Sequence, residues 1–382
     1  MIRETDAFFG PESPLKRAAE FGGRPYEERP QQLRMAQETA AHLQAGTKVC
    51  IEAPTGVGKT FAYLVPAIHF ALENECPVVV STHTISLQEQ IVEKDVPLLE
   101  KLLNLEFTAV LAKGRSNYIC LRRLNGVTSL DQQLLAGGGL LSEIEQICRW
   151  AQDTRDGTRG DLPFVPDRGL WQSICCEVGN CLNANCEFFP RCHLMRARRR
   201  LQSCQLIIVN HALFFSDLSM KLSSEEDDAG VLPAYGAVIL DEGQTLEDSA
   251  SNHLGLRVSS AHLKYVLNRL YNEQRDRGLL GDLMFTDARL AAADCARKAE
   301  AFFRKIVDWM EPQRQNPLRY ATPGHIPSFL DDPLRQLETE LEKLASDNAD
   351  KDERRQEIGS LAQLLHGERM AMHDFFNMTE PG

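Results

Sequence analysis

The stretch Ala53-Pro54-Thr55-Gly56-Val57-Gly58-Lys59-Thr60 has the residue types and the spacing of a phosphate-binding loop. Small residues allow the backbone N–H groups of such a loop to point at phosphate oxygens, and a lysine at its end neutralises their charge. A following hydroxyl group can hold Mg²⁺. We therefore predict that Pro54 to Thr60 bind ATP, that Lys59 acts on the transferred phosphoryl group and that Thr60 is a Mg²⁺ ligand.

Two adjacent carboxylates follow a second apolar run, Val238-Ile239-Leu240. Sites in open α/β sheets lie at the carboxyl ends of the strands, which is where Asp241 and Glu242 would fall. Phosphoryl transfer depends mainly on positioning and charge neutralisation. We expect Asp241 to hold Mg²⁺, Glu242 to orient or deprotonate the attacking water, and Gln244 to couple the site to a second lobe.

A glutamine precedes the phosphate-binding loop in the run Arg29-Pro30-Gln31-Gln32. A side-chain amide at this point of the chain can bond the edge of an adenine ring, and we predict this role for Gln32. A solvated helix start is an equally open interpretation of the same run.

Four of the eleven cysteines have a spacing that suits a metal group. Cys181, Cys186 and Cys192 are separated by four and five residues, and Cys120 lies about sixty residues upstream. Thiolates bind either Zn²⁺ or a [4Fe–4S] cluster, but structural zinc sites use tighter spacings. The pattern therefore favours a [4Fe–4S] cluster, and it leaves open whether one residue of the pair Cys175-Cys176 replaces a ligand.

The cysteine segment is rich in arginine although the chain carries a net charge of −12. An acidic chain has to bind a phosphate backbone through local clusters of Lys and Arg. We predict DNA contacts for Arg115, Arg196 and Arg199. A solvated face paired with the surrounding acids is the open alternative for each arginine taken alone.

Short apolar runs recur between helical patterns. The strands that they predict must position the site residues described above. They lie at Val49–Glu52, Val78–Ser81, Phe107–Leu111, Leu206–Val209 and Ala237–Leu240. Near-continuous apolar strands are typical of a buried parallel sheet with helices on both faces. We therefore expect an α/β fold built on a P-loop parallel sheet.

The chain of 382 residues is long enough for several packed units. We expect residues 1–112 and 205–251 to form the two parts of one ATP-binding lobe, residues 113–204 to be a metal-binding insertion, and residues 252–382 to be helical. The apolar runs are too short for a membrane span, and many cysteines without a secretory signal indicate a reducing compartment. We predict a monomeric cytoplasmic protein with no membrane partner.

The order of these motifs resembles the DinG/YoaA branch of the XPD-type superfamily 2 helicases. Besides the phosphate loop, the resemblance rests on Ser81-Thr82-His83-Thr84, Leu87-Gln88-Glu89-Gln90, Gly114–Cys120 and Val209–Phe214. It covers the chain from Arg29 to about Ala250.

This resemblance implies a 5′ to 3′ ATP-dependent DNA helicase that acts on single-stranded or forked DNA. It also implies a RecA-like first lobe into which a [4Fe–4S] domain and a helical arch are inserted. Cys120, Cys181, Cys186 and Cys192 match the cluster ligands of the family. Thr82 matches a motif that touches the DNA backbone.

Two departures from the family pattern bear on activity. The box reads Asp-Glu-Gly-Gln instead of Asp-Glu-Ala-His, which keeps both carboxylates and changes the residue that couples the lobes. The sequence holds neither the Ser-Ala-Thr nor the Gly-Arg-x-x-Arg motif of a second RecA-like lobe, so we expect a fragment or truncated product that hydrolyses ATP poorly alone. The alternative is an iron–sulfur module that binds single-stranded DNA, or a redox sensor, without helicase activity of its own.

Overall fold

A computed structural model describes residues 1–11, 13–21, 27–130, 138–177, 179–223, 230–281, 285–313, 320, 322–346 and 353–377. The chain divides into two compact units. Unit 1 comprises Met1–Cys176 and Glu187–Gly255, and unit 2 comprises Glu177–Cys186 and Leu256–Gly382. A ten-residue piece of the cysteine region therefore belongs with the C-terminal helices.

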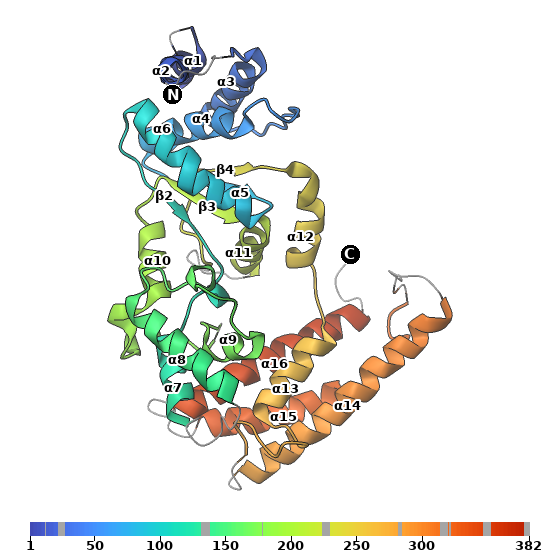
Figure 1. The fold of residues 1–382 in the computed structure, drawn as a ribbon. Coiled ribbons are helices and arrows are strands. Elements are labelled where there is room, and N and C mark those ends of the chain that lie inside the picture. The colour runs from blue at the N-terminus through green and yellow to red at the C-terminus, as the bar shows by residue number, and fades with distance from the viewer. Residues whose placement is uncertain are drawn as a thin grey trace. The chain divides into compact units, whose positions relative to one another are not determined.

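Unit 1 is built on a four-stranded parallel sheet with the strand order β2-β3-β1-β4 (Figure 1). The strands are β1 (Val78–Thr82), β2 (Ala109–Leu111), β3 (Leu206–Asn210) and β4 (Ala237–Leu240). Because side chains alternate along a strand, Val78 and Val80 of β1 face one core and Val79 faces another. The parallel α/β fold expected from the sequence is confirmed.

Helices pack on both faces of this sheet. Unit 1 contains α1 (Ile2–Phe9), α2 (Pro14–Phe21), α3 (Pro30–Ala45), α4 (Lys59–Asn74), α5 (Ile85–Gln90), α6 (Val96–Leu103), α7 (Leu121–Leu130), α8 (Gly138–Asp153), α9 (Arg168–Ile174), α10 (His193–Leu201), α11 (His211–Ser223) and α12 (Leu246–Leu254). Helix α4 shares a core with Val78 and Val80, whereas α11 contributes Phe214 and Phe215 to the core around Val79. The sheet is therefore buried on both sides, as its apolar strands require.

The strand predicted at Val49–Glu52 is wrong. These residues pair with none of the described strands, and Val49 is 46% exposed. The run holds only two large apolar residues, Val49 and Ile51, between the charged Lys48 and Glu52. Its gain from burial is therefore small, and it leads into the phosphate-binding loop as an extended, unpaired segment.

The chain between β2 and β3 forms α7 to α10. Helices α7, α8 and α9 surround a core of their own, which includes Leu124, Ile147, Trp171 and Ile174. This stretch contains the residues that the sequence marks as an insertion. Its assignment to an iron–sulfur domain stays a prediction.

Unit 2 is helical in its described residues. It contains α13 (Ser260–Leu270), α14 (Thr286–Met310), α15 (Asp331–Ser346) and α16 (Glu353–Asn377). Leu263, Val266, Leu267 and Leu270 are buried on one face of α13, as their spacing of three and four residues predicts. Within the described ranges, the helices of both units are too short or too polar to cross a membrane.

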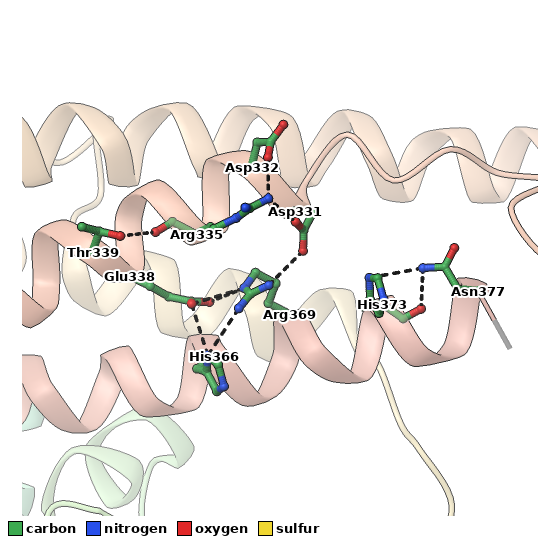
Figure 2. Close-up of polar contacts among 9 residues, drawn as sticks. All are labelled: Asp331, Asp332, Arg335, Glu338, Thr339, His366, Arg369, His373 and Asn377. Carbon is green, nitrogen blue, oxygen red and sulfur yellow. Dashed lines mark hydrogen bonds and ion pairs between the residues drawn. The ribbon is translucent and has the colours of Figure 1, made fainter. Parts of the chain in front are cut away.

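A network of ion pairs joins α15 to α16 (Figure 2). Glu338 of α15 is 5% exposed, and its carboxylate accepts a hydrogen bond of 2.9 Å from Nε of Arg369 in α16. Arg369 also donates to Asp331 at 3.1 Å, and His366 lies 3.3 Å from Glu338. An unpaired buried carboxylate would be costly, so these partners determine how α16 lies along α15.

Candidate nucleotide site and cysteine segment

The phosphate-binding loop runs from Ala53 into the start of α4. Gly56 and Gly58 have φ angles of +84° and +86°, a region that favours glycine. A Cβ atom at Gly58 would also lie 2.3 Å from Nε2 of Gln32, so a larger residue there would displace the amide of Gln32. The first N–H groups of α4 lack intrahelical acceptors, as at any helix start, and therefore suit an anion.

Two side chains from the run Arg29-Pro30-Gln31-Gln32 donate hydrogen bonds to backbone carbonyl groups of this loop. Nε2 of Gln32 donates to the carbonyl oxygen of Gly58 at 2.9 Å, and Nη1 of Arg29 donates to that of Gly56 at 2.9 Å. Nζ of Lys59 donates to Ala53 at 3.3 Å within the loop. The structure thus brings Gln32 to the loop, while its contact with adenine stays a prediction. We did not predict Arg29, although it stands in the same run.

Asp241 lies directly after β4, and its backbone N–H donates to the carbonyl oxygen of Ser81 at 2.8 Å. The hydroxyl group of Tyr63 donates to Oδ2 of Asp241 at 3.1 Å. Tyr63 is 3% exposed and stands one helical turn after Thr60 in α4. One phenol therefore links the start of α4 to the acidic box.

The phenol of Tyr63 stays protonated at neutral pH. Burial raises its pKa well above the usual value, and the charge of Asp241 raises it further. A neutral phenol can donate a hydrogen bond to a carboxylate, so Tyr63 orients Asp241. We did not predict this role. The available signal was the position of Tyr63 three residues after Thr60 on the same helix face.

Glu242 adopts a left-handed backbone conformation with φ of +55°. This region costs a non-glycine residue about 1–2 kcal/mol. The N–H of Glu242 donates to Oδ1 of Asp241 at 3.0 Å, and Nε2 of Gln244 donates to Oε2 of Glu242 at 2.7 Å. The two carboxylates are thus held in one turn. Gln244 contacts Glu242 here, and its coupling to another lobe stays a prediction.

The end of β1 carries the residue for which we predicted a DNA contact, Thr82. Its side chain is fully buried, while the neighbouring His83 is exposed. Oγ of Ser81 and Nδ1 of His211 form a buried hydrogen bond of 2.7 Å, and burial lowers the pKa of His211. The DNA contact of Thr82 stays a prediction, and in this conformation the exposed side chain at that place is His83.

In unit 1, Cys120 and Cys192 pack against a small core formed by Tyr118, Cys176 and Leu194. A hydrogen bond with Cys176 lowers the pKa of the Cys120 thiol to about 6, against the opposing effect of burial. The thiolate is the form of cysteine that binds metals. The chemistry of this thiol therefore fits a metal ligand.

The predicted ligands are distributed over both units, because Cys181 and Cys186 belong to unit 2. Among the described residues, three or more Cys, His, Asp or Glu side chains do not gather as a metal site would require. The set of four ligands stays a prediction. Of the pair that we left open, Cys176 lies beside Cys120, whereas Cys175 is buried in the core of α7, α8 and α9.

The predicted DNA-binding arginines lie in two places. Arg196 and Arg199 are exposed on α10, where Arg196 donates to the carbonyl oxygen of Arg155 and lies 2.7 Å from Nδ1 of His193. Arg115 is half-buried at the start of a short 3₁₀ turn that follows β2. Their contacts with DNA stay predictions.

Known proteins share parts of this sequence. Residues 33–132 match the family described as DEAD/DEAH box helicase. The ATP-dependent DNA helicase YoaA of Escherichia coli (strain K12) is 34% identical over 260 residues, which are 67% of this chain and 38% of that protein. YoaA of Haemophilus influenzae is 32% identical over 62% of this chain and 36% of that protein.

The ATP-dependent DNA helicase DinG of Escherichia coli (strain K12) is 36% identical over 227 residues. These residues are 55% of this chain and 30% of that protein. The matched region thus spans less than two-fifths of the length of each of these relatives.

Proposed function

Since this chain belongs to the DinG-type helicases, we propose that it is the ATP-binding and iron–sulfur part of an enzyme that couples ATP hydrolysis to 5′ to 3′ movement on single-stranded DNA. The observation that most supports the ATP-hydrolysing part of this proposal is the bond between Tyr63 and Asp241. It joins the helix that begins with Lys59 to the acidic box, which is the arrangement that phosphoryl transfer from Mg²⁺-bound ATP needs.

Each residue of this site has a proposed role. The loop N–H groups and Lys59 bind the β- and γ-phosphates, and Thr60 and Asp241 hold Mg²⁺. Glu242 orients or deprotonates the attacking water, and Gln244 holds its carboxylate. A second RecA-like lobe would supply further charge neutralisation, so turnover by this chain alone should be slow.

We propose that Cys120, Cys181, Cys186 and Cys192 hold a [4Fe–4S] cluster. When bound, such a group cross-links distant parts of the chain and can exchange an electron. The lowered pKa of Cys120 supports its place in the ligand set. The exposed Arg196 and Arg199 would face the phosphates of a DNA strand.

The nucleotide site is tested by the binding of a fluorescent ADP analogue with Mg²⁺ to the whole chain. We expect Lys59→Ala to weaken this binding by about tenfold or more, because a charge-assisted contact with phosphate is lost. Lys48→Ala, an exposed lysine outside the loop, is the matched control. Equal affinities of the Lys59→Ala variant and the unaltered chain would refute the site.

The metal group is tested by measuring iron, acid-labile sulfide and zinc in anaerobically purified protein. About four irons and four sulfides per chain are expected, with loss in the Ser variants of the four ligands and retention in Cys50→Ser, an exposed cysteine. Zinc without sulfide would reject the iron–sulfur assignment. If iron and sulfide are lost in Cys176→Ser but retained in Cys192→Ser, Cys176 replaces Cys192 in the ligand set.

A further inference from the structure

The segment Glu177–Cys186 carries two of the predicted cluster ligands and folds with the helices of unit 2. Its first residue, Glu177, is held by Arg269 of α13. Nη1 of Arg269 donates to both carboxylate oxygens of Glu177, at 2.9 and 3.0 Å. Nη2 of Arg269 donates to Glu357 of α16. One guanidinium group therefore ties the segment to two helices.

The ion pair is largely removed from water. The side chain of Arg269 is 16% exposed and that of Glu177 is 20% exposed. Burial acts to lower the pKa of Arg269, but the charges of Glu177 and Glu357 outweigh it and raise that pKa. The ring of Tyr265 lies under the guanidinium, 5.6 Å away, and its hydroxyl group donates to Glu177 at 3.4 Å. Removal of the arginine would thus leave a poorly solvated carboxylate without its positively charged partner.

The segment stays close to α16 after Glu177. Gly179 has a φ angle of +76°, and a Cβ atom there would lie 2.7 Å from Oγ of Ser360. Asn180 is 3% exposed, and its Nδ2 donates to Oε2 of Glu177 at 3.4 Å. Glu177, Gly179 and Asn180 therefore all make close contacts within unit 2, directly before Cys181.

We propose that Arg269 is a positioning residue for Cys181 and Cys186, because it fixes the segment of unit 2 on which they stand. The proposal rests on the cluster assignment in the proposed function. The helices would then have to be folded before these two thiols reach their working positions.

The first test measures alkylation rates of individual cysteines in the metal-free full chain by mass spectrometry. In Arg269→Ala, Cys181 and Cys186 should react about tenfold faster, because the segment opens more often once its buried ion pair is lost. The exposed Cys50 should react unchanged. Arg297→Ala, which removes the exposed partner of Glu273 in the same unit, is the matched control.

The triple variant Glu177→Arg, Arg269→Glu and Glu357→Gln should restore slow alkylation, because it re-forms the ion pair in the opposite sense and removes the carboxylate of Glu357, which would repel the new one. A general loss of packing would not be repaired in this way. Circular dichroism shows whether unit 2 stays folded in Arg269→Ala. If it does not, the alkylation rates are measured instead in Glu177→Gln, which keeps the bond between Arg269 and Glu357. Unchanged rates in the folded variants, or the absence of rescue by the swap, would overturn the proposal.

The second test measures iron per chain and the rate of iron loss to a chelator. Arg269→Ala should contain less iron and lose it faster than Arg297→Ala. If the unaltered chain contains no iron and sulfide, the cluster assignment itself has failed. If it contains both and Arg269→Ala retains them equally well, only the role of Arg269 has failed.

Discussion

Tyr63 and Asp241 are separated by 178 residues in the chain and meet through a single hydrogen bond. The bond matters because Asp241 has two oxygen atoms and only some orientations present one to a metal ion. Oδ2 accepts from Tyr63 and Oδ1 accepts from the N–H of Glu242. The carboxylate is therefore oriented by the protein itself, which would lower the cost of the Mg²⁺ binding that we propose.

Replacing Tyr63 by Phe should weaken Mg²⁺-dependent nucleotide binding about tenfold. A hydrogen bond to a charged group contributes roughly 1.5–3 kcal/mol, and its loss leaves Asp241 less well oriented. The affinity for a fluorescent ADP analogue would be measured with Mg²⁺ and with EDTA, and only the first should fall. Tyr271→Phe, which removes a phenol bonded to Asp276, serves as control. Equal losses in both buffers would rule out a role through the metal.

At the scale of elements, α13 and α16 are joined by two charged contacts. Arg269 donates to Glu357 near one end, and Nδ1 of His262 lies 2.5 Å from Oε1 of Glu368 near the other. The hydrogen bond with Glu368 raises the pKa of His262, against a smaller opposing effect of burial. The folded unit therefore binds a proton more tightly at His262 than the unfolded chain does.

This contact predicts a pH dependence for unit 2. With a raised pKa in the folded state, the contribution of His262 is fully present below about pH 6.5, the usual histidine pKa, and is lost as the pH rises through the folded value. The thermal midpoint of unit 2 should thus fall more steeply with rising pH in the unaltered chain than in His262→Gln. If the thermal midpoint of unit 2 falls equally steeply with pH in both proteins, the proposed contribution of His262 is contradicted.

At the scale of the molecule, the two units have separate hydrophobic cores. The proposed nucleotide site lies wholly in unit 1, and the segment with Cys181 and Cys186 lies in unit 2. Ligands that bind a folded unit stabilise that unit by mass action. A bound nucleotide should therefore directly stabilise unit 1 only.

Calorimetry of the metal-free chain should show two thermal transitions, of which Mg²⁺ with ADP raises only one. At a hundredfold excess of nucleotide over the dissociation constant, the added stability of unit 1 is about 2.7 kcal/mol. At the same nucleotide concentration, Lys59→Ala should reduce this shift by about half or more and leave the other transition unchanged. A single transition, or an equal shift of both, would show that the units unfold together.

The sequence by itself determined the local features of this protein. The glycines of the phosphate loop, the apolar runs of β1 to β4, and the leucines of α13 were all predictable, because each depends on residues close together in the chain. The acidic box was placed correctly after β4 for the same reason. The run at 49–52 misled us, since its strand would have needed a partner that local pattern cannot reveal.

Only the tertiary structure decided which distant residues act together. Tyr63 reaches Asp241, Arg269 holds Glu177 from 92 residues away, and Thr82 is buried where a surface contact was expected. The sequence has no periodic or spaced pattern that pairs Tyr63 with Asp241 or Arg269 with Glu177. Such contacts arise from how helices pack on a sheet or on one another, and the free energy that selects them comes from burial and pairing between elements rather than within one.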